Sequence, residues 1–280
     1  MDAFRKDSRQ KIYRLARPLS HFAFRANLSS LAPPLVRLCR VARPGPAFSP
    51  VKQSCFGFMR LFGSPLPFTI DARINRAYAA CLSRHGPTPQ GVLWNSQKTQ
   101  SARFAALLAA VSEDRATWQQ ASRAPVIADI GCGYGALLAY MRARSGMAVW
   151  TYHGIDITPA MIHACQAQYP EMAAQFIIGK APPVPVDYCL FSGTFNLCLI
   201  EDPARWQRYI LDALVPCWRA SRHGMVFNLL CAATPTIRNH IFYASRNSII
   251  AALQAQFGDV TWHPTRQVKH DVTFLVTRRS

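Results

Sequence analysis

The chain has 280 residues, and half of them are apolar, which is enough for one large domain with a substantial core. No apolar run approaches the roughly 18 residues that span a bilayer, so we expect a cytoplasmic protein without a transmembrane segment. The nine cysteines are an odd number and include no C-x-x-C pair, which argues against a disulfide framework and against a metal site. The net charge of +18 suits anionic partners but selects none of them.

Basic residues and prolines concentrate at the N-terminus. Residues 1–60 hold 12 Lys and Arg against two acids, and the first 70 residues contain eight of the 20 prolines. We therefore predict a flexible basic arm at 1–65 and a folded domain at 66–280. Three interpretations of the arm stay open: a tail without a function of its own, a contact for nucleic acid or an anionic membrane, or an organellar transit segment. Few serines and many prolines count against the third.

Two helices are predicted before the first strand, and they form the helical part 66–120 of the domain. The first covers 72–84 and ends at the turn residues of 85–91. The second lies within 94–111, and its apolar residues recur at helical spacing on one buried face: Phe104, Leu107, Leu108 and Val111. Another face carries polar residues: Ser96, Gln100 and Arg103. That face is either solvated or packs over the loop that follows the first strand.

A glycine-rich loop follows the first strand, which is predicted over 126–130. The strand ends in Asp129-Ile130, and Gly131, Gly133 and Gly135 then alternate with other residues. Glycines remove the Cβ atoms that would block a ligand and permit backbone angles that other residues resist. The pattern indicates a strand that turns abruptly into a helix, predicted over 134–144, whose first turn approaches a ligand closely.

A second strand, predicted over 149–157, ends in another acid. Asp156 lies 21 residues past Gly135 and is placed to accept hydrogen bonds from both hydroxyls of a ribose. The loop lacks the G-x-G-x-x-G step of dinucleotide-binding proteins, which disfavours an NAD-linked oxidoreductase. An anion at Asp129 would repel a pyrophosphate but suits a ligand that carries a sulfonium and an ammonium.

The segment Asp-Ile-Gly-Cys-Gly-Tyr-Gly resembles the first motif of the class I S-adenosylmethionine-dependent methyltransferases, and Asp156 matches their second-strand acid. The resemblance covers roughly residues 94–280, with the cofactor-binding core at 121–280. It implies a doubly wound, mostly parallel seven-stranded α/β sheet in the order 3-2-1-4-5-7-6. It also implies S-adenosyl-L-methionine as the cofactor.

The rest of the chain alternates between predicted strands and helices, as such a sheet requires. Thr158-Pro159 supplies an N-cap and a first-turn proline for a helix over 160–169. Further strands are predicted at 175–179, 187–191, 224–230, 260–264 and 272–277. Further helices are predicted at 203–219 and 247–257.

The resemblance assigns cofactor contacts residue by residue. Asp129 with the backbone of Gly131, Gly133 and Gly135 should hold the methionine portion, and Cys132 is a small residue that fits in the loop. Asp156 should take the ribose, with Ile157 and Met161 beside the adenine. Arg103 or Gln100 is a candidate for the methionine carboxylate, and Ser192 and Gly193 lie where the methyl group should face the acceptor. Lys180-Ala181 stands where the family often has an acid for the adenine amino group. Since a lysine cannot accept that hydrogen bond, backbone or apolar packing must recognise the adenine there.

No residue is predicted as a catalytic base, because methyl transfer from a sulfonium depends largely on positioning and desolvation. The Asn-Pro-Pro-Tyr element of amino-group methyltransferases is absent after the fourth strand, where 192–196 stands instead. We therefore expect a methyltransferase that acts on an unidentified acceptor, most simply a small molecule. The alternative is a non-catalytic protein of this fold that binds nucleic acid or a partner through its basic arm. The sequence leaves the oligomeric state open.

Overall fold

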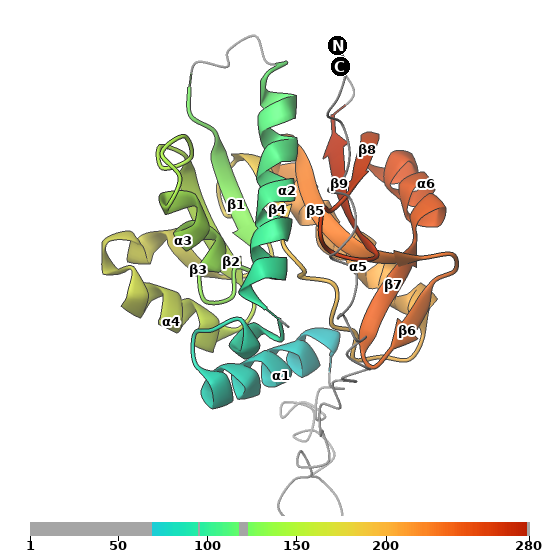
Figure 1. Cartoon of the computed structure of the whole chain (residues 1–280), viewed down its shortest axis with the longest axis horizontal. Helices are drawn as coiled ribbons and strands as arrows, with labels where there is room; N and C mark the ends of the chain where they lie inside the picture. Colours follow the sequence, from blue (N-terminus) through green and yellow to red (C-terminus); the bar gives the residue numbers. More distant parts are fainter. Residues whose placement is uncertain (1–68, 95, 118–122, 279–280) are drawn as a thin grey trace, which may run out of the picture. The chain divides into compact units, whose positions relative to one another are not determined.

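The computed structural model describes residues 69–94, 96–117 and 123–278, so the predicted arm lies outside the described residues. Within these residues, helices alternate with strands along the chain, and the strands form a mostly parallel sheet (Figure 1). Its parallel strands lie side by side in this order: β3 (Phe176–Ile178), β2 (Thr151–Asp156), β1 (Val126–Ile130), β4 (Val186–Phe191) and β5 (Ser221–Ala232). Antiparallel to β5 runs β9 (Asp271–Thr277), and β8 (Asp259–Pro264) pairs with β9. The expected order 3-2-1-4-5-7-6 is confirmed, since β8 and β9 are its sixth and seventh strands.

A short β-hairpin adds two strands that were not predicted. Here β6 (Thr236–Arg238) pairs antiparallel with β7 (Ile241–Ser245). In turn, β7 pairs in parallel with the last residues of β5. The hairpin turns at Asn239 and His240, which both have positive φ angles, 50° and 60°. Asn-Gly is the usual sequence signal for such a two-residue turn. Because His240 occupies the second position instead of glycine, the hairpin was not predicted from the sequence.

The predicted helices all form, with boundaries that differ by a few residues. They are α1 (Ile70–His85), α2 (Gln97–Arg115), α3 (Ala136–Arg142), α4 (Pro159–Gln168), α5 (Pro203–Ala220) and α6 (Arg246–Gln256). Pro159 begins α4 as predicted, but the Thr158 side chain makes no capping hydrogen bond. None of the helices in the described ranges is both long and apolar enough to span a membrane.

Each face of the sheet buries its own set of apolar side chains. On one face, Ile127 of β1 packs with the predicted apolar face of α2 and with side chains of α3 and α4. On the other, Ala128 and Ile130 of the same strand pack with α5 and α6. The parallel strands are therefore apolar on both sides, which explains why they appear in the sequence as continuous apolar runs. In Figure 1, α2 and α3 cover the near face, and α1 runs across the carboxyl-terminal ends of the strands.

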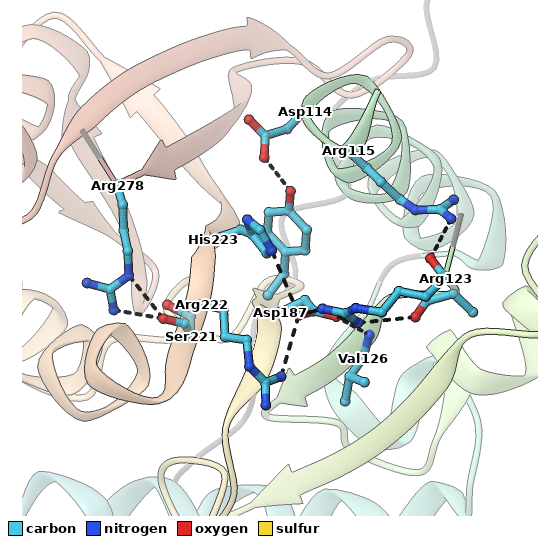
Figure 2. Close-up of polar contacts among 11 residues, drawn as sticks. Asp114, Arg115, Arg123, Val126, Asp187, Ser221, Arg222, His223 and Arg278 are labelled. Carbon is cyan, nitrogen blue, oxygen red and sulfur yellow. Dashed lines mark hydrogen bonds and ion pairs between the residues drawn. The ribbon is translucent and has the colours of Figure 1, made fainter. Parts of the chain in front are cut away.

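A polar cluster ties together the opposite, amino-terminal ends of the strands (Figure 2). Asp187 at the start of β4 is fully buried and accepts from both terminal nitrogens of Arg123, at 2.6 and 2.7 Å. It also accepts from the backbone N–H of Val126 at 2.8 Å, and Nη1 of Arg222 lies 3.5 Å from its Oδ1. Burial alone would raise the pKa of Asp187, but the Arg123 and Val126 hydrogen bonds and the arginine charges hold it below its ordinary value.

Candidate cofactor and acceptor site

A cavity of about 580 Å³ lies at the carboxyl-terminal ends of the parallel strands, where this fold class places its ligands. Residues at the ends of β1, β2 and β4 form one side, and residues of α1, α5 and the segment before α2 form the others. Most residues predicted to bind the cofactor line it: Asp129, Gly131, Cys132, Gly133, Asp156, Ile157, Met161, Lys180, Ser192 and Gly193.

The glycine loop is held tightly between β2 and the segment after β4. The N–H groups of Gly131 and Cys132 both donate to the Ile155 carbonyl, at 2.7 and 3.1 Å. Gly131 has a φ of 75°, and a Cβ atom there would lie 2.7 Å from Cγ2 of Thr194. Thr194 cannot easily move away, because its hydroxyl donates to the Ile130 carbonyl at 2.7 Å. Both the backbone angle and the space therefore require glycine at this position.

Asp129 is a nearly fully buried carboxylate at the end of β1. Its Oδ2 accepts a hydrogen bond from the Tyr152 hydroxyl at 2.8 Å. Burial raises the pKa of Asp129 to about 7, against the opposing effect of the Tyr152 hydrogen bond. Near neutral pH this carboxyl is therefore close to its pKa, and a cationic ligand would favour the charged form.

Asp156 links the end of β2 to the glycine loop. Its Oδ2 accepts from the Gly133 N–H at 3.0 Å, and its Oδ1 accepts from the Thr158 N–H at 2.8 Å. Burial raises the pKa of Asp156, and these two hydrogen bonds, together with one from the Thr158 side chain, oppose the rise. Because a carboxylate has about four acceptor sites, Asp156 keeps acceptor capacity for a ligand hydroxyl.

Three predicted site residues do not line the cavity. Arg103 is buried away from it and forms an ion pair with Asp271, with 2.5 Å between Nε and Oδ2. Its guanidinium lies 4.5 Å from the ring centre of Trp94. Gly135 begins α3 beside Tyr169, and Ala181 follows Lys180 outside the lining. Gln100, the other candidate for the methionine carboxylate, does line the cavity, and the Tyr134 hydroxyl lies 3.3 Å from its Oε1.

The structure adds lining residues that the sequence analysis missed. Asp71 and Tyr78 come from α1, and Tyr209 comes from α5. Asp71 and Tyr78 are spaced so that they share one face of α1, and this spacing is the only signal for them in the sequence. Nothing local shows that this face meets the ends of strands that lie up to 120 residues further along the chain.

Comparison with known proteins identifies the family of this chain. The model of the family described as "Methyltransferase domain" matches residues 127–216, from β1 into α5. The Mycobacterium tuberculosis protein Rv1506c, which is named as a candidate methyltransferase, is 36% identical over 121 residues. That match covers 42% of this chain and 72% of the relative. The chain belongs to the class I S-adenosylmethionine-dependent methyltransferases.

The magnesium protoporphyrin IX methyltransferase of Synechocystis, solved with bound S-adenosylmethionine, has the same fold as this methyltransferase. The similarity has a TM-score of 0.53 and covers 77% of this chain and all of the other, at 10% sequence identity. For this methyltransferase, S-adenosylmethionine is the cofactor. The side chains at the cavity suit that molecule, since two buried carboxylates face a space that must take a sulfonium, an ammonium and a ribose.

Proposed function

We propose that the protein transfers a methyl group from S-adenosylmethionine to a small acceptor inside the cavity. In this proposal Asp129 and the glycine loop hold the methionine portion, and Asp156 accepts from the ribose hydroxyls. Ile157 and Met161 flank the adenine, and Ser192 and Gly193 lie beside the reacting methyl group. The observation that carries the proposal is that one cavity contains both the cofactor-directed carboxylates and an aromatic wall.

The aromatic wall supports an acceptor with an apolar or aromatic part. Trp94, Phe104, Phe191 and Phe195 all line the cavity. Trp94 packs directly over the end of β4, since a Cβ atom at Gly193 would lie 2.8 Å from its Cζ2. Phe191 and Phe195 stack with 5.3 Å between ring centres. Such a wall excludes water from the methyl group and gains free energy when an apolar acceptor covers it.

The transfer itself requires little covalent chemistry from the protein. The acceptor atom attacks the methyl carbon in line with the carbon–sulfur bond, which breaks and returns its electron pair to sulfur. S-adenosylhomocysteine leaves, and the acceptor loses a proton if it began protonated. Holding both reactants in line and desolvated lowers the barrier. The proposal assigns no catalytic base to a side chain.

The proposed division of the chain follows the same elements. The methyltransferase domain covers 66–280, in which 66–120 contributes α1 and α2 to the cavity wall and 121–280 is the cofactor-binding core. The basic arm at 1–65 has no assigned part in the methyl transfer.

The proposal is tested by calorimetric titration of the full chain with S-adenosylmethionine, S-adenosylhomocysteine and NAD. Binding of the first two without NAD is expected, followed by a screen of small aromatic acceptors with labelled methyl groups. A preference for NAD would contradict the cofactor placement. Transfer of label only to nucleic acid or protein would contradict the small acceptor.

Asp156→Ala tests the ribose contact within the same titration. We expect affinity for S-adenosylhomocysteine to fall at least about a hundredfold, because two charge-assisted hydrogen bonds are lost. Asp212→Ala is the matched control, since Asp212 also lines the cavity but is exposed on α5. Its effect should stay below about threefold, as exposed charges contribute little in water. Unchanged affinity in Asp156→Ala would remove the ribose assignment.

A further inference from the structure

A carboxylate from α1 lies where the sequence of the loop after β3 supplies only a lysine. Lys180 forms an ion pair with Asp71, through Nζ and Oδ2. The Tyr209 hydroxyl donates to the other oxygen of Asp71, Oδ1, at 2.8 Å. All three residues line the cavity, and they come from three different elements. The loop after β3 has no acidic residue at position 180, but the carboxylate of Asp71 lies beside Lys180 in the folded protein.

The same helix also reaches the ribose acid. One turn beyond Asp71, the Asn75 side-chain amide approaches the Ile157 carbonyl at 3.5 Å. Another turn on, Tyr78 lines the cavity, and burial together with the charge of Asp156 raises the pKa of its hydroxyl. These residues at i, i+4 and i+7 share one helix face. That face thus runs from the Asp156 end of the cavity to the Lys180 end.

Asp71 keeps acceptor capacity for a ligand. A carboxylate offers about four acceptor sites, and Lys180 and Tyr209 occupy one on each oxygen. The Asp71 side chain is 29% exposed, so it is partly desolvated but remains open to the cavity. Lys180 and Tyr209 have hydrogen-bond donors directed at the carboxylate, which fixes its orientation before a ligand arrives.

We propose that Asp71 accepts a hydrogen bond from the exocyclic amino group of the adenine and thereby selects the base of the cofactor. Lys180 and Tyr209 are positioning residues that orient this carboxylate. The inference rests on the proposed placement of the ribose at Asp156. It replaces the expectation that only backbone and apolar packing recognise the adenine at this point.

The test compares S-adenosylhomocysteine with an analogue whose purine carries hydrogen in place of the 6-amino group. Both are titrated into the full chain and into Asp71→Ala, which gives a cycle of one protein change and one ligand change. The wild type should prefer the amino-bearing ligand by roughly tenfold or more, the usual effect of a hydrogen bond to a charged group. Asp71→Ala should bind both ligands alike, within about twofold.

Three further variants separate this effect from a general disturbance. Glu171→Ala is the matched control, because it removes another ion pair, with Arg142 at 2.7 Å, outside the cavity lining. It should keep the full preference. Lys180→Ala should keep most of the preference, since Tyr209 still holds the carboxylate. Asp71→Asn, which retains an acceptor oxygen and the side-chain size, should show an intermediate preference even if Asp71→Ala folds poorly.

The outcomes distinguish this inference from the proposed function. If the wild type binds neither ligand, the cofactor placement itself is wrong. If the wild type binds S-adenosylhomocysteine and every Asp71 variant keeps the same preference for the amino group, the placement survives and the role of Asp71 is refuted.

Discussion

At the scale of single residues, the two buried carboxylates of the cavity differ in their partners. Asp129 accepts from one neutral hydroxyl, that of Tyr152, whereas Asp156 accepts from two backbone N–H groups. Backbone amides at the end of a strand are fixed in place and favour an ionised acceptor. The pKa of Asp129, at about 7, leaves that residue more dependent on its ligand for its charge.

Cofactor affinity should therefore depend on pH through Asp129. Its pKa is raised in the folded protein, so it holds a proton below about pH 7 and must release it before the cation binds. We expect the affinity for S-adenosylmethionine to rise by roughly an order of magnitude between pH 5.5 and 7.5. Calorimetry in buffers of different ionisation enthalpy would show the released proton. Asp129→Asn should bind more weakly with a flat profile, and a sloped profile in that variant would assign the titration to another group.

The raised pKa of Asp129 also affects the free energy of unfolding when no cofactor is added. A carboxyl with a higher pKa in the folded state than in the unfolded state binds more protons when folded. Its contribution therefore favours folding at low pH and weakens as the pH rises from about 4 to 7. This trend is opposite in sign to the trend that we expect for cofactor affinity.

Gly131 should not tolerate a side chain, although alanine adds only one carbon. Gly131→Ala would force a φ of 75° on alanine and place its Cβ 2.7 Å from Thr194. We expect a loss of about 1–3 kcal/mol in stability, and weaker cofactor binding, because the loop must shift. Gly146→Ala is the matched control, since no atom lies within 4 Å of the added carbon and no positive φ is involved. Urea unfolding of both variants checks this, and equal stability of the two would contradict the strained-loop argument.

At the scale of secondary-structure elements, ion pairs with a buried carboxylate join segments that are distant in sequence. Arg103 of α2 pairs with Asp271 at the start of β9, and the ion pair holds α2 against β5 and β9. Asp187 joins the beginning of β4 to the segment before β1, as Figure 2 shows. Removing one partner from such a pair leaves the other charge without compensation, so each pair fixes the arrangement of its elements.

Asp187→Asn should weaken the protein most at neutral pH. The pKa of Asp187 is lowered in the folded state, so its contribution is present above the unfolded pKa of about 3.9 and is lost as the pH falls through the lower folded value. Because Arg123 is partly exposed, we expect a loss of only about 1–3 kcal/mol at pH 7. Urea unfolding at pH 7 and pH 3 should show the difference shrinking in acid. Glu171→Gln, in an exposed pair, should change stability by less than about 0.5 kcal/mol.

At the scale of the whole molecule, charge is distributed unevenly along the chain. Residues 1–60 carry 12 basic and two acidic side chains out of a total of 32 and 14. The cavity, by contrast, contains several acids among its lining residues. Methyl transfer to a small acceptor would use the cavity and leave the charge of the arm for another purpose, such as contact with an anionic surface.

Reversing the charge of the arm separates these uses. We expect replacement of Lys6, Arg9, Lys11 and Arg14 by Glu in the full chain to leave S-adenosylmethionine affinity and turnover on a small acceptor within about twofold. Turnover is measured at two salt concentrations, because screening would expose any long-range effect of the arm. A large loss of turnover that high salt also produces in the wild type would instead show that the acceptor is recruited through the arm.

Features that depend on neighbouring residues could be predicted from the sequence alone. Apolar periodicity predicted the helix within 94–111, continuous apolar runs predicted the parallel strands, and the glycine spacing predicted the loop between β1 and α3. Asp129 and Asp156 could be placed at strand ends because each is one of the last two residues of an apolar run that is predicted as a strand. The β6–β7 hairpin was missed because His240 stands where glycine is the usual signal.

Contacts between side chains that are distant in the sequence could not be predicted without the three-dimensional structure. Lys180 and Tyr209 reach Asp71 across 109 and 138 residues, and Arg103 reaches Asp271 across 168. Local propensity acts over a few turns of helix or strand, whereas these pairs depend on how whole elements pack at the end of the sheet. For that reason the sequence did not show that Lys180, which stands where the family often has an acid, pairs with Asp71 near the start of the domain.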